Sequence, residues 1–524
     1  MRLCPGAIAA VAVGAAALAG PLAAQGKALK PPADLDAWVS RAMREFEVPG
    51  LALVIVKDGQ VVALRGYGTR TAGAREPVDE HTVFQIASNT KAFTAALLAM
   101  LVDEGKVHWD DRVQKYLPWF ELYDPWVTRE FTVRDLLTHR SGLGLGAGDL
   151  TWWHSDYSRE DIVRRLRSVP PVTSFRTAYA YDNVLYIAAG LVVEAASGRK
   201  WDDFLRERIL VPLGMTDANT TVTTFTPGAN VATPHGLVKG RMVVVPRDTV
   251  DNVGGAGTIN ASVADLSRWL VTQLDSGRAP DGKRLWSARR AREMWSGVTV
   301  QPVGVPAPPL TSLRANFSEY ALGWGVRDYR GRKLALHSGG LAGMVSRTML
   351  VPEDRLGIVV LTNAEAPAMD AIAFHVLDEY LGGPQPDLIA GFKATSAAGN
   401  EEADSVVRAA EAARDRSSKP SLPLARYAGR YSDRLYGDAT IAEEGGHLVL
   451  RLSHSPAFVG DLEHWQYDTF AARWRVPNLA DAYVTFALAP DGSVESFRMA
   501  AVSPAADFSF DYQDLLFRPV RPAR

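Results

Sequence analysis

The stretch Phe84-Gln85-Ile86-Ala87-Ser88-Asn89-Thr90-Lys91 runs directly into the apolar segment 92–101, which is typical of a buried helix. Ser88 would stand at the first turn of this helix, where free backbone N–H groups and the positive end of the dipole surround its hydroxyl. Lys91 follows three residues later, on the same face and within reach of that hydroxyl. Because removal from water lowers the pKa of a lysine, Lys91 can take the serine proton. The stretch therefore predicts a nucleophile, Ser88, beside its base, Lys91.

The Ser-x-x-Lys pattern is short, and roughly one chance match is expected in a chain of this length. Such a match is present at Ser197-Gly198-Arg199-Lys200. Gly198 suits the position just beyond a helix C-terminus, and no apolar run carries Lys200 inward, so this copy predicts only a helix end. By itself, Ser88 could equally be a helix N-cap followed by a surface lysine. Other motifs in the chain are needed to choose between these two interpretations of Ser88.

The composition narrows the class of protein. The chain has 524 residues, of which 47% are hydrophobic and 22% charged, as in ordinary globular proteins. That length exceeds one ordinary core and predicts two or more domains. Lys and Arg (57) nearly balance Asp and Glu (59), so there is no basic field for nucleic acid, and no nucleic-acid partner is expected.

The N-terminus has the pattern of a secretory signal peptide over residues 1–24. Arg2 supplies the positive start, residues 7–19 the apolar core and residues 20–24 a small-residue exit. Cleavage is expected near Ala24, and the protein is expected to be periplasmic or secreted, without a stable membrane span once cleaved. An uncleaved anchor is the alternative. Cys4 is the only cysteine, so cleavage would leave neither a disulfide nor a thiol nucleophile.

Strand-like segments lie on both sides of a long helical region. The first two flank Asp58-Gly59, a strong hairpin signal. We expect one antiparallel sheet built from both ends of residues 30–390, flanked by helices at 35–47, which Asp34 can cap, and 367–381, with a helical insert beside it. This is an α/β (α+β) class. The predicted strands are 51–56, 61–64, 321–326, 333–336, 346–350 and 357–361.

The last quarter of the chain differs in composition from the rest. Residues 391–421 are small, charged and polar, which predicts a partly helical linker. Residues 422–524 contain short strand candidates separated by Gly-Gly and Asp-Gly turns, so we expect a small all-β barrel or sandwich.

Two further segments carry chemistry. Tyr181 and Asn183 precede an apolar helix and can point into one cleft, where a phenol relays protons and an amide both donates to and accepts from a substrate amide. His337-Ser338-Gly339-Gly340 follows the strand 333–336. Gly339 lets a substrate lie close to the strand, and the N–H groups of Gly340 and Ser88 could form an oxyanion hole. Taken alone, the first pair could serve packing and capping, and His337 could be a satisfied histidine at a strand end.

In chain order, Ser88-x-x-Lys91, Tyr181-x-Asn183 and His337-x-Gly339 resemble the three motifs of the serine β-lactamase and penicillin-binding-protein superfamily. The likeness covers about residues 35–381 and looks closest to the class C branch, which also holds D-aminopeptidases, DD-peptidases and family VIII esterases. The region after Tyr427 resembles the lipocalin-like domain that follows some of these hydrolases. Connecting phrases also fit: 136–143, 212–215 and 254–257 leading to Asp265.

The resemblance implies acylation of Ser88 and deacylation without metal or cofactor. Lys91 and Tyr181 would share proton transfer, and which of them is the base stays open. Asn183 would bind the acyl-side amide, and His337 the carboxylate end or the leaving group. His139 lies in a family phrase and is expected to be structural. The ten histidines show no His-Glu-x-x-His spacing, so no metal site is expected.

One departure concerns substrate choice. Class C β-lactamases have Lys-Thr-Gly where this chain has His337-Ser338-Gly339, so a fixed positive charge is replaced by an imidazole. This disfavours efficient cephalosporin hydrolysis and leaves peptide or ester cleavage compatible. The expected substrates are small molecules or short peptides, notably D-amino-acid peptides or small esters, and a homo-oligomer is possible. The alternatives are a weak β-lactamase and a non-catalytic penicillin-binding sensor or scaffold.

Overall fold

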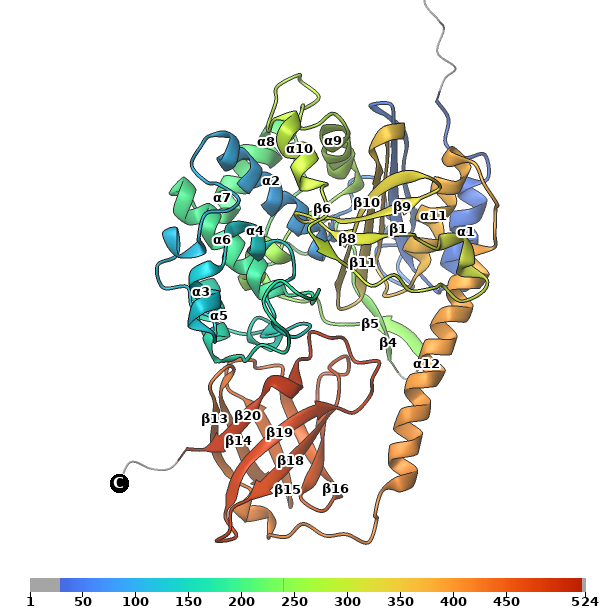
Figure 1. The fold of residues 1–524 in the computed structure, drawn as a ribbon. Coiled ribbons are helices and arrows are strands. Elements are labelled where there is room, and N and C mark those ends of the chain that lie inside the picture. Colours follow the sequence, from blue (N-terminus) through green and yellow to red (C-terminus); the bar gives the residue numbers. More distant parts are fainter. Residues whose placement is uncertain (1–28, 239, 521–524) are drawn as a thin grey trace, which may run out of the picture.

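The computed structural model describes residues 29–238 and 240–520, so the expected signal peptide lies outside the described residues. Figure 1 shows an upper α/β unit and, below it, a β-barrel formed by the C-terminal part of the chain. Within the described ranges, no helix combines the length and apolar character needed to cross a membrane.

The upper unit is built on one eight-stranded sheet in the order β2-β1-β12-β11-β10-β9-β8-β7, in which all neighbours are antiparallel. β1 pairs with β12 from Leu51↔Thr362 to Lys57↔Leu356, which joins the two ends of the unit as expected. Asp58 (φ 53°) and Gly59 (φ 79°) form the tight turn between β1 and β2. The strands are β1 (Gly50–Lys57), β2 (Gln60–Gly68), β7 (Thr299–Val300), β8 (Ser318–Tyr320), β9 (Gly325–Tyr329), β10 (Arg332–Leu341), β11 (Met344–Val351) and β12 (Leu356–Thr362).

Helices cover both faces of the sheet. Alternate residues of β1 point to opposite faces, so Leu51, Leu53 and Ile55 share a core with α1 (Leu35–Glu45) and α11 (Ala368–Leu381). The intervening residues share the other core with α2 (Thr90–Asp103) and α9 (Val263–Leu274). The insert beside α2 contains α3 (Pro125–Glu130), α4 (Val133–Leu136), α5 (Arg159–Arg165), α6 (Asn183–Ser197), α7 (Trp201–Leu205), α8 (Val211–Leu213) and α10 (Ala288–Met294). Small two-stranded pairs join β3 (Phe84–Gln85) to β6 (Asn260–Ala261) and β4 (His235–Val238) to β5 (Arg241–Val244).

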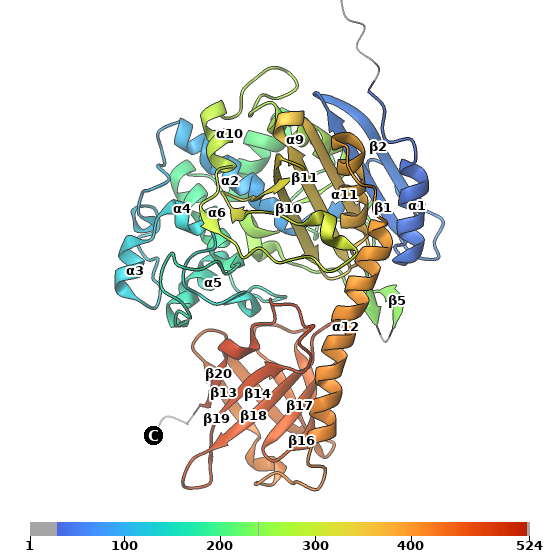
Figure 2. The ribbon, with the colours of Figure 1, turned by 45° about the vertical axis from the view of Figure 1, so that its right-hand side comes forward.

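The C-terminal strands close into a barrel in sequence order, and a single helix, α12 (Leu388–Ala413), leads down to it (Figure 2). The sheet, the helices and this barrel confirm the predicted fold class. The barrel strands are β13 (Gly429–Asp433), β14 (Gly437–Glu444), β15 (His447–Leu452), β16 (Val459–Gln466), β17 (Thr469–Trp474), β18 (Ala482–Leu488), β19 (Val494–Ala501) and β20 (Leu516–Pro519).

Three local expectations were wrong. Residues 321–324 form a turn between β8 and β9 instead of a strand, because Gly323 takes φ 79° and packs against the Lys91 backbone. Asp34 precedes α1 but makes no side-chain cap; its carboxylate pairs with His375 instead. His337 to Gly340 lies inside β10 and not beyond the strand's end.

Candidate active site

Ser88 and Lys91 lie together at the start of α2. Ser88 sits in a 3₁₀ turn, Ala87–Asn89, that leads into the helix, and Lys91 Nζ lies 3.0 Å from Ser88 Oγ. Ala87 takes φ 48°, a left-handed conformation that non-glycine residues rarely adopt and that concentrates at functional sites. The second Ser-x-x-Lys copy is a helix end as expected: Gly198 takes φ 71°, and the exposed Lys200 pairs with Glu194.

Lys91 is fully buried and makes two further hydrogen bonds, donating to Asn183 Oδ1 at 2.7 Å and to the Ala256 carbonyl at 2.9 Å. Burial lowers the pKa of Lys91 to about 7, while the charges of Asp149 and Asp182 act in the opposite direction. Since both other partners are acceptors, a neutral amine keeps its two N–H groups on them and turns its lone pair toward Ser88 Oγ. This geometry suits proton removal from Ser88.

Asn183 is oriented by Asp149, a residue that the sequence did not single out. Asn183 Nδ2 donates to Asp149 Oδ2 at 2.8 Å, and Trp152 Nε1 donates to Asp149 Oδ1 at 2.8 Å. In its ionised form Asp149 only accepts, which places the amide nitrogen toward Asp149 and the amide oxygen toward the Lys91 donor. Burial raises the pKa of Asp149 to about 7, against hydrogen bonds from Trp152 and Asn183.

Tyr181 lies beside both Ser88 and Lys91. Burial raises the pKa of Tyr181 well above its usual value, and a hydrogen bond with Ser88 acts against that shift. Lys91 Nζ lies 4.8 Å from the centre of the Tyr181 ring, and the buried His139 ring packs 4.2 Å behind it. His139 Nδ1 accepts from the Asp182 backbone N–H at 3.1 Å, which suits the expected structural role.

His337 is neutral in this site. Burial, followed by the nearby charge of Lys91, lowers its pKa to about 3. Its Nδ1 can only donate to the Ser338 carbonyl, at 2.6 Å, so Nε2 accepts from the Tyr320 hydroxyl at 2.9 Å. Both ring nitrogens thus have partners within the protein, and a role for His337 at the substrate remains a prediction.

Gly339 brings β10 against the nucleophile turn. A side chain at this position would place Cβ 2.1 Å from the Ile86 carbonyl oxygen and 2.9 Å from Ser88 N. Gly340 and Ser88 line the same cleft, and the oxyanion hole formed by their N–H groups remains a prediction.

We expect Gly339→Ala to lower the acylation rate by about 100-fold or more, because the new methyl group must push Ser88 away from its partners. Burst kinetics with a p-nitrophenyl ester measure this rate. Gly144→Ala is the control, since its Cβ would meet nothing closer than 3.8 Å. A Gly339→Ala protein that is acylated as fast as the wild type would contradict the close approach.

The cleft around Ser88 has a volume of about 1010 Å³. Its lining includes Tyr181, Asn183 and His337 from the upper unit and residues 505–510 from the barrel. Two arginines missed by the sequence analysis, Arg327 and Arg347, also line it; Arg347 pairs with Asp370 at 2.6 Å. Two acidic residues, Glu365 and Asp507, line the same cleft, so the arginines add positive charge to a lining of mixed sign.

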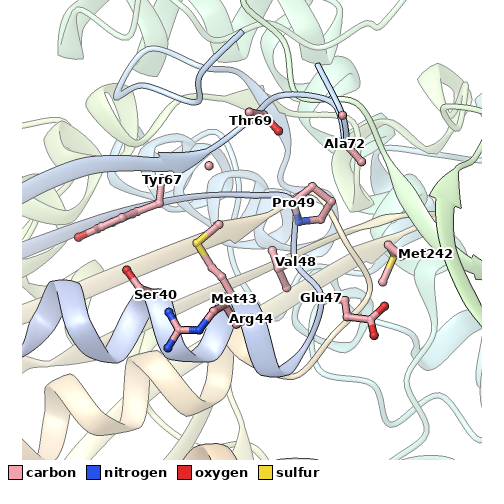
Figure 3. A pocket seen from close by; sticks show the side chains of 12 residues that line it. Ser40, Met43, Arg44, Glu47, Val48, Pro49, Tyr67, Thr69, Ala72 and Met242 are labelled. Atoms are coloured by element: carbon pink, nitrogen blue, oxygen red, sulfur yellow. The ribbon is translucent and has the colours of Figure 1, made fainter. Parts of the chain in front are cut away.

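Other candidate sites lack comparable chemistry. A pocket of about 590 Å³ lies between α1 and β2, lined by Ser40, Met43 and Tyr67, and contains no pairing of a serine with a base (Figure 3). Among the described residues, one group could present metal ligands close together, Asp34, His375 and Glu379, and it lies at α1 and α11, away from the Ser88 cleft. Its two carboxylates are exposed, and such groups commonly occur without an ion.

Three features together are typical of the β-lactamase and penicillin-binding-protein superfamily. They are the antiparallel sheet, the helical insert beside it, and the buried Lys91 in contact with Ser88 in the turn before α2. The chain belongs to the beta-lactamase family, whose model matches residues 35–380. Residues 413–519 match a domain of unknown function, DUF3471. Neither match distinguishes class C, family VIII or a lipocalin-like subfamily.

Named relatives agree with this assignment. An unguisins hydrolase, ungD, of Aspergillus violaceofuscus (strain CBS 115571) is 27% identical over 88% of this chain and 86% of its own. Penicillin-binding protein 4 of Amycolatopsis lactamdurans is 32% identical over 63% of this chain and 86% of its own. The octameric penicillin-binding protein homologue from Pyrococcus abyssi has the same fold, with a TM-score of 0.58 and 22% identity over 93% of this chain and 99% of that chain.

Proposed function

We propose that this protein is a serine hydrolase that cleaves peptide, amide or ester bonds through an acyl-enzyme on Ser88. The observation that carries the proposal is the contact between Ser88 Oγ and the buried Lys91 Nζ, at 3.0 Å. With a pKa of about 7, Lys91 is neutral and able to accept a proton in about half of the molecules at neutral pH.

In the acylation step, Ser88 Oγ attacks the substrate carbonyl carbon while its proton passes to Lys91 Nζ. The backbone N–H groups of Ser88 and Gly340 would hold the resulting oxyanion. The bond to the leaving group then breaks, and that group takes a proton through Lys91 or Tyr181. Water, losing a proton to the same groups, hydrolyses the Ser88 ester and restores the hydroxyl.

D-amino-acid peptides or small esters are the substrates we infer. The neutral His337 leaves no fixed positive charge at the third-motif position, which argues against efficient cephalosporin hydrolysis. Arg327 and Arg347 are cationic groups of the cleft lining that could pair with a substrate carboxylate. The unguisins hydrolase relative supports hydrolysis by this fold. Secretion and a homo-oligomeric state remain proposals based on the sequence.

A substrate panel tests this proposal. It contains a short-chain p-nitrophenyl ester, a D-alanyl anilide, a D-Ala-D-Ala peptide and a chromogenic cephalosporin. Turnover of the ester or a D-peptide above the cephalosporin would support the proposal. Faster cephalosporin turnover would favour the β-lactamase alternative. Labelling of Ser88 without release of the label would favour a sensor. The absence of both labelling and turnover would favour a scaffold.

The acylation rate should depend on pH through Lys91. Its pKa lies near 7, below the usual 10.5, so the amine is protonated and inactive as a base below that pH and neutral above it. We therefore expect the burst rate to rise about tenfold per pH unit up to about pH 7 and then to level off. Stopped-flow traces of the ester, corrected with Ser88→Ala, measure the profile. A rate that keeps rising to about pH 10 would contradict a lowered lysine pKa.

A further inference from the structure

One of the barrel segments at the Ser88 cleft, residues 508–511, contacts the catalytic residues and the loop beside them. The Phe508 ring packs edge-on against Tyr181 at 5.7 Å. The Phe508 backbone lies so close to Gly146 that a Cβ there would meet the Phe508 carbonyl oxygen at 2.5 Å. This segment therefore touches both the Tyr181 side chain and the loop that leads to Asp149.

Asp511 holds the backbone on both sides of Asp149. Its two carboxylate oxygens accept from Gly148 N at 2.7 Å and from Leu150 N at 2.9 Å. Asp149 begins a 3₁₀ turn, Asp149–Thr151, that follows Gly148 at φ 82°. Because the partners of Asp511 are the two neighbours of Asp149, docking of the barrel sets the position of the Asp149 backbone.

Ser509 reaches the Asp149 side chain itself. Ser509 Oγ donates to Asp149 Oδ2 at 2.9 Å, and Asn183 Nδ2 donates to the same oxygen at 2.8 Å. Asn183 Oδ1 in turn accepts from Lys91. Ser509, Asp149 and Asn183 are all buried, so water cannot easily replace a missing partner. A continuous chain of hydrogen bonds thus runs from the barrel to Lys91.

We propose that Ser509 and Asp149 are positioning residues for Lys91, so that the barrel completes the catalytic centre of the upper unit. Ser509 holds the Asp149 carboxylate, and Asp511 holds the backbone on both sides of Asp149. Asp149 holds the Asn183 amide, and the amide oxygen keeps Lys91 Nζ directed at Ser88. This inference rests on the proposed acyl-enzyme function and assigns part of that site to the barrel.

Ser455 supplies a matched control. It is a buried barrel serine that also donates across the boundary, to the Trp153 carbonyl at 3.2 Å, but it makes no bond with Asp149. Ser455→Ala and Ser509→Ala each remove one buried hydrogen bond between the barrel and the upper unit. A role in docking alone would affect both variants alike.

The test measures the burst rate of Ser88 acylation by a p-nitrophenyl ester in the full chain, with thermal melting of each variant. Ser509→Ala should lower the acylation rate about tenfold, and Ser509→Thr, which restores a hydroxyl, should recover it to within about threefold of wild type. Ser455→Ala should stay within about twofold of wild type while its melting temperature falls about as much as that of Ser509→Ala.

The outcomes separate this inference from the proposed function. A wild-type protein that is not acylated would overturn the proposed function and this inference with it. A wild-type protein that is acylated, with Ser509→Ala equally fast or Ser455→Ala equally slow, would overturn this inference alone. Failure of Ser509→Thr to recover the rate would also overturn it, because the argument depends on the hydroxyl donor.

Discussion

Ser88→Ala is expected to abolish turnover, lowering kcat/KM for a short-chain p-nitrophenyl ester by at least about 10³-fold. Removal of a nucleophile that acts with a base leaves only what binding and the oxyanion donors contribute. The protein should fold normally, since Ser88 Oγ holds no structural group other than Lys91 and Tyr181. Steady-state kinetics measure the loss of turnover, and mass spectrometry checks that the variant no longer forms the acyl-enzyme that the wild type forms.

The second Ser-x-x-Lys copy offers the control for this variant. Ser197 lies at the end of α6, and its hydroxyl bonds only the local backbone of Arg199. Ser197→Ala should therefore keep wild-type activity. Equal rates in Ser88→Ala and the wild type would remove the case for catalysis at Ser88 and favour the scaffold alternative.

Lys91→Met is expected to lower the acylation rate by about 10²- to 10⁴-fold, the usual contribution of a positioned base. Methionine fills a similar volume but cannot accept the Ser88 proton. The rise of the rate due to the amine should vanish in this variant, so any change that remains near pH 7 would come from Asp149, whose pKa burial also raises to about 7. Burst rates across pH measure both effects.

Lys200→Met, from the second copy, is the matched control, since Lys200 is exposed and pairs only with Glu194. It should leave rate and pH profile unchanged. If Lys91→Met is acylated at close to the wild-type rate, Lys91 is not the base, and Tyr181 must accept the Ser88 proton.

Much of the upper unit was predictable because the relevant signals are local. The Asp58-Gly59 turn between two apolar runs determines the hairpin, and three-residue spacing alone brings Lys91 to Ser88. Motif order then predicted that Tyr181 and Asn183 would join them, and the structure places both in the same cleft. The catalytic roles of these residues remain predictions.

The remainder depends on contacts between distant parts of the chain. Asp149 and Ser509 are 360 residues apart, and neither lies in a motif that points to the other. Arg327 and Arg347 reach the cleft only because of the strand register. The turn at 321–324 looks like a strand in the sequence because its apolar residues are buried; Trp324 lies in the core that contains α2, and the residues of the turn are not paired in the sheet.

Helix α12 sets the rotation of the barrel relative to the upper unit, because it contacts both of them. Its first turn packs on Leu310 through Gly391, and beyond its last turn Arg414 donates to the His464 and Trp465 carbonyls of β16. Because both ends of the helix are held in place, each inserted residue would move the barrel about 1.5 Å along the helix axis and rotate it by about 100°. Natural variation in the length of α12 should therefore come in near-whole turns, with seven residues tolerated far better than two.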